Sequence, residues 1–362
     1  MLTSASISTA LGKIALTLQS LLLLIGQYNA APTQNAAILP VVQRSLAEIQ
    51  TNLVFLSKQI PTETSSSTDL AITSKETVSE MNDKIRSATV NILCTSNGPG
   101  SVRSATASGI VIDPRGVILT NSHVAEYVLL KDYPEQNAST CVVRTGSPAE
   151  PAYKVRVLFM PKEWALNNAK LLLEDKPKGT GENDYALLLI TTKIDRTPIN
   201  TDLPYLTPDE AYDSSIQDSP VLIAGYPAEF TGSIIANRSL SEVSSLSKIT
   251  GGYYFDPKDT DRLDLINVGG SIASQGGSSG GAVLDIRSGN LVGVIVTTTS
   301  APTTAQRELF ALTTSYISRK LKAETGKNIR QFIDTNLNAS ADAFGGAPAQ
   351  ELIKILTSAL SN

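Results

Sequence analysis

The sequence Gly276-Gly277-Ser278-Ser279-Gly280-Gly281 leads without interruption into the apolar run Ala282-Val283-Leu284. Glycine permits backbone conformations that other residues avoid, so such a stretch can form a tight turn whose N–H groups point to one side. A flexible linker has a similar composition, but a linker is not expected between β-strands. The stretch therefore predicts a turn that presents a serine hydroxyl beside backbone N–H donors.

A serine hydroxyl becomes a strong nucleophile only when a neighbouring base takes its proton. The chain has one histidine, His123, so a histidine-dependent mechanism must use that residue. The pattern Gly277-x-Ser279-x-Gly281 also fits the nucleophile turn of α/β-hydrolases, but there the histidine follows the serine. Because His123 precedes the serines, the order that remains is His, Asp, Ser, as in chymotrypsin.

Three segments in this order resemble the motifs of bacterial trypsin-like peptidases. Residues 108–124, which include Leu-Thr-Asn-Ser-His-Val at 119–124, resemble the histidine region. Residues 183–188, Asn-Asp-Tyr-Ala-Leu-Leu, are similar to the aspartate motif, and residues 277–281 to Gly-x-Ser-Gly-Gly. The resemblance covers about residues 85–320. It implies a mainly β, chymotrypsin-like fold of two six-stranded antiparallel barrels, with the site between them.

The resemblance also implies a role for each motif residue. Ser279 would attack the scissile carbonyl, His123 would move the proton, and Asp184 would orient His123. The N–H groups of Gly277 and Ser279 would form the oxyanion hole. Ser278 is a rival nucleophile, but only Ser279 is followed by Gly-Gly and then a strand.

Simpler readings exist for these residues, namely a structural histidine and an Asp in a turn before a strand. No metal ion or organic cofactor is implied, because such a triad needs none. The chain also has no C-x-x-C pair, and a single histidine cannot build a histidine-rich metal site.

The predicted substrate pocket departs from that of trypsin. The resemblance implies that Ala273 forms its base, where an acidic residue would select Lys or Arg. Val296, Thr297 and Thr298 are expected to line its wall. We therefore predict cleavage after small aliphatic residues.

Ser278 also stands where digestive members carry the Asp that pairs with a new N-terminus. We therefore expect the chain to fold directly into a competent form or to be gated in another way.

Short runs of β-forming residues from about residue 85 agree with this fold, and the polar tract 192–218 divides them. We expect barrel one at about 85–195, barrel two at about 215–305, and a protease domain over 85–320. The stretch from about 304 has a helical pattern. Residues 321–362 are expected to form a C-terminal helical tail, with one helix around Ile329, Phe332 and Ile333 and another around Leu352, Ile355 and Leu356. This tail is too short for the peptide-binding domain that follows the protease in periplasmic members.

Residues 1–84 precede the predicted domain. The apolar run 14–25 fits a cleaved secretory leader or the first helix of a hairpin, and apolar spacing over 39–60 predicts the second helix. Residues 61–75 are rich in Ser and Thr and are typical of a linker. The helices would serve membrane anchoring or self-association. We expect an extracytoplasmic location: periplasmic, secreted or membrane-anchored.

The resemblance makes Cys94 and Cys141 members of neighbouring strands in the first barrel. A cross-strand disulfide and a pair of buried free thiols are both possible states of these cysteines.

The net charge of −4 gives no indication of nucleic-acid binding. The expected partner is a peptide or protein substrate. Alternatives to a serine endopeptidase are an inactive trypsin-like binding module and another serine hydrolase, such as an esterase.

Overall fold

The computed structural model describes residues 76–98, 101–174, 179–199, 202–211, 217–228, 240–260, 262–271, 276–299 and 307–361. The predicted leader or helical hairpin, the linker at 61–75 and the pocket residue Ala273 lie outside the described residues. None of the helices in these ranges is both long enough and apolar enough to cross a bilayer.

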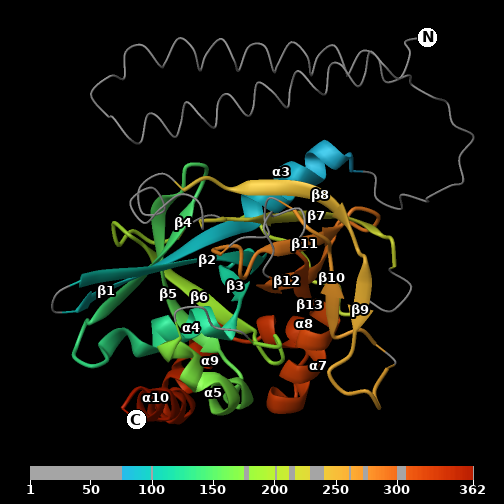
Figure 1. Cartoon of the computed structure of the whole chain (residues 1–362). Coiled ribbons are helices and arrows are strands. Elements are labelled where there is room, and N and C mark those ends of the chain that lie inside the picture. The colour runs from blue at the N-terminus through green and yellow to red at the C-terminus, as the bar shows by residue number, and fades with distance from the viewer. Residues whose placement is uncertain are drawn as a thin grey trace, which may run out of the picture. The chain divides into compact units, whose positions relative to one another are not determined.

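The first sheet closes into a six-stranded antiparallel barrel in the order β1-β2-β3-β6-β5-β4 (Figure 1). Its strands are β1 (Thr89–Gly98), β2 (Ser101–Asp113), β3 (Val117–Thr120), β4 (Ser139–Thr145), β5 (Glu150–Phe159) and β6 (Ala186–Lys193). Helix α4 (Ser122–Leu129) and the 3-10 helix η2 (Leu130–Asp132) follow β3, whereas α5 (Lys162–Asn168) and the 3-10 helix η3 (Ala169–Leu173) follow β5. The sequence patterns did not predict these short helices.

The second sheet has the order β8-β7-β11-β12-β13-β10-β9 and curls into a half-barrel. Its strands are β7 (Pro220–Gly225), β8 (Val243–Lys248), β9 (Gly251–Tyr253), β10 (Leu265–Asn267), β11 (Ala282–Asp285), β12 (Asn290–Thr298) and β13 (Leu309–Thr313). Only Ile249 and Thr250 separate β8 from β9, which stand at opposite ends of this order. One bent segment therefore borders both β7 and β10, which is why seven strands occur where six were expected. The mainly β, double-barrel class is confirmed.

Strand β6 shows why its sequence is a continuous apolar run. Ala186, Leu188 and Ile190 pack in a cluster with α4 and α5. Leu187 and Leu189 point the other way, into a cluster that includes residues of the second sheet such as Leu222 and Leu284. Successive side chains of a strand alternate between its faces, and both faces of β6 are buried. The alternating core therefore links the two sheets.

Helix α3 (Val78–Ala88) precedes the first barrel and runs directly into β1. Thr77 and Glu80 form a capping box at its start, which satisfies two N–H groups that a helix terminus otherwise leaves without partners. Met81, Ile85 and Ala88 are fully buried in the core cluster that contains Leu187. Residues before 85, where the sequence placed the start of the domain, thus pack in the same core as the first barrel.

The C-terminal part contains β13 and then α7 (Thr314–Thr325), α8 (Ile329–Ile333), α9 (Leu337–Gly345) and α10 (Ala347–Leu360). The helical prediction from about residue 304 is wrong for 309–313, which form β13 between β12 and β10. A five-residue strand is too short to reveal a period, and four of its residues are buried. The second sheet therefore extends past residue 305.

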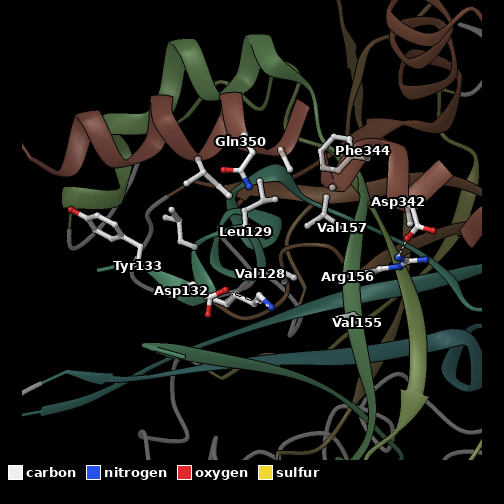
Figure 2. A pocket seen from close by; sticks show the side chains of 16 residues that line it. Val128, Leu129, Asp132, Tyr133, Val155, Arg156, Val157, Asp342, Phe344 and Gln350 are labelled. Carbon is white, nitrogen blue, oxygen red and sulfur yellow. Dashed lines mark hydrogen bonds and ion pairs between the residues drawn. The ribbon is translucent and has the colours of Figure 1, made fainter. Parts of the chain in front are cut away.

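Helices α9 and α10 cover the outer side of barrel one beside α4 and β5. Figure 2 shows Arg156 of β5 pointing toward Asp342 of α9, and their atoms Nη1 and Oδ1 are 2.5 Å apart. Between these elements lies a cavity of about 690 Å³. Val128, Val157 and Phe344 contribute to its apolar lining (Figure 2). No Ser, Cys or His is among the described residues that line it.

Cys94 of β1 and Cys141 of β4 lie directly opposite each other in the antiparallel register. Their Cα atoms are 4.0 Å apart, and the two sulfur atoms form a disulfide. The bond closes a loop with a sequence separation of 47 residues. Such a crosslink restricts the unfolded chain and so favours the folded barrel.

We expect the double substitution Cys94→Ala with Cys141→Ala to lower the free energy of unfolding by about 2–4 kcal/mol, because it frees this loop in the unfolded state. Chemical denaturation of the oxidised protein and of the variant measures the difference. A reductant should destabilise the natural chain and leave the variant unchanged. Two alkylatable thiols in the denatured, unreduced protein would contradict the disulfide.

Candidate active site

The polar residues before His123 connect the end of β3 to neighbouring backbone. Each donates a side-chain hydrogen bond to a carbonyl oxygen: Thr120 Oγ1 to Ser108 at 2.8 Å, Asn121 Nδ2 to Asp184 at 2.9 Å, and Ser122 Oγ to Tyr185 at 2.7 Å. All three donors are fully buried. Because α4 begins at Ser122, His123 stands in its first turn, and the bonds from Asn121 and Ser122 hold that turn against the segment 183–185.

Asp184 accepts two hydrogen bonds from His123. Its Oδ2 lies 2.7 Å from the ring atom Nδ1, and its Oδ1 lies 3.1 Å from the backbone nitrogen of His123. An Asp at Nδ1 holds the hydrogen on that atom and leaves Nε2 as the basic nitrogen. The two residues that the sequence paired are therefore in contact.

Opposing effects act on the protonation of His123. Burial disfavours the charged ring, but the negative charge of Asp184 and the hydrogen bond to it outweigh burial and raise the pKa of His123 above its ordinary value. The ring is still one-third exposed, so it can exchange protons with a bound molecule. His123 is thus a stronger base than an isolated imidazole.

Tyr316 of α7 positions the turn before Asp184, a role that the sequence did not reveal. Its hydroxyl donates to Oδ1 of Asn183 at 3.0 Å and accepts from the Asn183 N–H at 3.1 Å. Asn183 has a φ of 57°, a left-handed conformation that Asn tolerates better than most residues. A tyrosine 132 positions after Asp184 carries no local signal that could have identified it.

The turn at 276–281 needs its glycines because it touches other backbone. Gly277 and Gly280 have φ values of 95° and 82°, which residues with a side chain rarely adopt. A Cβ atom at Gly280 would lie 2.0 Å from the carbonyl oxygen of Ser108. The Gly280 N–H also donates to the Ile295 carbonyl at 2.8 Å, which fixes the turn against β12.

The two serines of this turn have different surroundings. Ser278 is 1% exposed, and its buried hydroxyl has no hydrogen-bond partner within the described ranges. Ser279 is partly exposed and lines a cavity together with His123 and Asp184. Within those same ranges the Ser279 hydroxyl also has no partner, and it is not hydrogen-bonded to His123. Unliganded hydrolases often close this contact only when substrate binds.

Gly277 and Ser279 carry backbone N–H groups that donate to no acceptor in the part of the chain that the structure describes. Gly277 is held from its other side, because its carbonyl oxygen accepts from the Ser108 hydroxyl at 2.8 Å. Both residues line the cavity that contains His123. The described part of the fold therefore uses neither N–H group itself.

The cavity around these residues has a volume of about 430 Å³. Val296, Thr297 and Thr298 of β12, which the sequence analysis assigned to the pocket wall, line it together with Ser279. Gly181 approaches that wall closely, since a Cβ there would lie 3.0 Å from Cγ2 of Val296. The candidate reacting groups and the β-branched side chains of β12 thus line the same cavity.

Within the described residues, no group of three or more His, Cys, Asp or Glu side chains could hold a metal ion. The arrangement of a serine, a basic imidazole and free N–H donors suits acyl transfer.

A closed barrel and a half-barrel that contribute residues to one such cavity define a chymotrypsin-like double-barrel protein. The family model of the trypsin-like peptidase domain matches residues 107–294, just over half of the chain, and the chain belongs to this family of serine peptidases. The matched residues include all three motifs that resembled those of trypsin-like peptidases. No curated protein matches the chain.

We expect Asp184→Asn to lower the pKa of His123, because the substitution removes the charge that raises it. The sole histidine gives one assignable imidazole signal in an NMR titration. In the natural chain the folded-state pKa should exceed about 6.5, the unfolded value. The pair then stabilises the fold fully below that value, and this stabilisation disappears as pH rises through the folded pKa. Equal pKa values in the two proteins would contradict the interaction.

Proposed function

We propose that this chain is a serine endopeptidase in which His123, Asp184 and Ser279 act as a triad. The observation that carries the proposal is the 2.7 Å contact of Asp184 with Nδ1 of His123, inside the same cavity as Ser279. This contact leaves Nε2 as the base on the side away from Asp184. Membership of the trypsin-like peptidase family supports a peptide or protein substrate.

In the proposed reaction, the Ser279 oxygen attacks the scissile carbonyl carbon while Nε2 of His123 takes the serine proton. The carbonyl oxygen becomes an oxyanion that accepts from the N–H groups of Gly277 and Ser279. The carbon–nitrogen bond then breaks, and protonated His123 gives its proton to the leaving amine. A water molecule repeats the attack on the acyl-enzyme, with His123 again as base, and frees Ser279.

Asp184 contributes by orienting His123 and by stabilising the imidazolium that forms in each step. Its carboxylate is held in place by the backbone N–H of His123, and rotation of the ring would break the bond to Nδ1. Tyr316 acts through Asn183 and is a positioning residue.

The wall formed by Val296, Thr297 and Thr298 supports a preference for a small aliphatic residue before the scissile bond. β-Branched side chains in this wall leave a shallow, apolar space that excludes long side chains. Ala273 belongs to this proposal through the family resemblance alone.

An extracytoplasmic location, of the kind found for bacterial periplasmic relatives, is part of the same proposal. The Cys94–Cys141 disulfide supports it, because disulfides persist mainly in oxidising compartments. Anchoring or self-association through the segment 1–60 also remains a proposal.

A fluorophosphonate probe tests whether Ser279 is activated, because it reacts with a serine whose proton has been taken by a base. We expect the natural chain to be labelled, Ser279→Ala to be unlabelled, and Ser278→Ala to be labelled. Peptide hydrolysis by Ser279→Ala should fall at least about a thousand-fold. If the natural chain is neither labelled nor active, the inactive binding module becomes the better description.

Peptide-library profiling tests the pocket. We expect Ala or Val before the scissile bond, and Val296→Ala should admit larger residues with a change in selectivity of about ten-fold. Val292→Ala is the matched control, because Val292 lies on the same strand, is fully buried and does not line the cavity. A preference for Lys or Arg directly before the scissile bond would contradict this pocket.

A further inference from the structure

The candidate active-site cavity is lined by carboxyl groups that the proposed mechanism does not use. Glu126, Glu174 and Glu182 line it in addition to Asp184. Neither Lys nor Arg is found among the described residues around it. Among the described residues that line the cavity, His123 is the one group that can carry positive charge. An excess of one sign in a cleft attracts molecules of the opposite sign.

Glu126 is the carboxyl group whose surroundings need an explanation. It lies three residues after His123 in α4, and residues at this spacing are neighbours on one helix face. Glu126 is only 4% exposed. Its Oε2 is buried without a hydrogen-bond partner, and no Lys or Arg of the described chain forms an ion pair with it.

An unpartnered carboxyl group in such a place is costly. A buried polar group that lacks a partner destabilises the fold, and an ionised carboxylate does so more strongly. Burial and the nearby negative charge of Asp184 raise the pKa of Glu126 well above its ordinary value. An alanine or leucine at this helix position would bury apolar surface at no such cost. Because Glu126 also lines the cavity, a rotation of its side chain would bring this group to a bound molecule.

We propose that Glu126 binds a Lys or Arg side chain of the substrate, located within two residues of the scissile bond but outside the pocket walled by Val296. This inference rests on the proposed peptidase function and names its substrate class, a peptide with a basic residue beside a small aliphatic one. The exposed carboxyl groups of Glu174 and Glu182 add attraction at the cavity rim.

The position within two residues follows from helix and strand dimensions. Three residues of α-helix advance about 4.5 Å from His123, whose ring contacts the reacting bond. An extended peptide advances about 3.3 Å per residue. A basic side chain one or two residues from that bond can therefore reach Glu126 while its neighbour fills the Val296 pocket. A guanidinium or ammonium group would give Oε2 both a hydrogen-bond donor and a positively charged partner.

The first experiment profiles the natural chain with a library randomised at two positions on each side of the scissile bond. It then compares kcat/KM for an Arg peptide with that for the same peptide carrying citrulline, a neutral analogue of similar shape. We expect enrichment of Lys and Arg at one position, and an Arg-to-citrulline ratio that Glu126→Gln lowers at least about ten-fold, as loss of a buried charge pair does. No enrichment, or an unchanged ratio, overturns the proposal.

Glu135→Gln is the matched control, since it removes an exposed carboxyl group that does not line the cavity. It should leave the ratio as in the natural chain. Glu126→Asp keeps the charge and should retain more of the preference for Arg than Glu126→Gln does. If Glu126→Gln lowers hydrolysis of both peptides equally, Glu126 supports the fold and does not select substrate.

Equilibrium binding separates this inference from the peptidase proposal. Isothermal titration calorimetry measures the binding of each of the two peptides to Ser279→Ala, and this measurement needs no hydrolysis. If Ser279→Ala binds the Arg peptide more tightly than the citrulline peptide, and the double variant Ser279→Ala, Glu126→Gln does not, the result supports Glu126 as the site for a basic side chain. This holds even if the natural chain cleaves no peptide. Equal binding of both peptides by Ser279→Ala overturns the proposal that Glu126 binds a basic side chain, whether or not the natural chain is a peptidase.

Discussion

The contact between the backbone of Ser108 and the turn at 276–281 is the constraint on which the rest of the site depends. The Ser108 N–H donates to the Ser279 carbonyl at 2.7 Å, while its hydroxyl donates to Gly277 and accepts from the Tyr226 N–H. No side chain fits between the two backbones at Gly280. Because Ser108 belongs to β2 and Gly280 precedes β11, this one contact sets where barrel one meets the second sheet.

The candidate reacting groups come from opposite sides of that contact. His123 follows β3 and Asp184 precedes β6, both in barrel one, whereas Ser279 precedes β11 of the second sheet. Tyr316 of α7 forms a second connection, because its two hydrogen bonds to Asn183 reach back from the C-terminal half to the turn that carries Asp184. Relative movement of the sheets would therefore break polar contacts on both sides of the cavity.

Two carboxyl groups in this cavity show how surroundings divide their roles. Asp184 accepts hydrogen bonds from two donors of His123, and its charge raises the pKa of His123. Glu126 is equally buried but has no donor for Oε2, and the charge of Asp184 opposes its ionisation. One carboxylate is thus committed within the protein, whereas we propose that the other finds its partner in a positively charged ligand.

The sequence by itself predicted the class of fold, through its short β-forming runs and its resemblance to trypsin-like peptidases. It also supplied the candidate reacting residues, because a glycine turn before a strand and a sole histidine are visible without tertiary structure. The residues 296–298 that it proposed for the substrate pocket line the cavity, whereas Ala273 is not among the described residues. Helix α3, strand β13, the positioning role of Tyr316 and the isolation of Glu126 were decided only by tertiary structure. Each depends on partners distant in sequence: β13 is too short to show a period, Tyr316 acts across 133 positions, and an unpartnered carboxyl group is recognised only when its neighbours are known. Local patterns report the geometry that a residue imposes on its own chain, whereas burial and partnership are properties of the packed molecule.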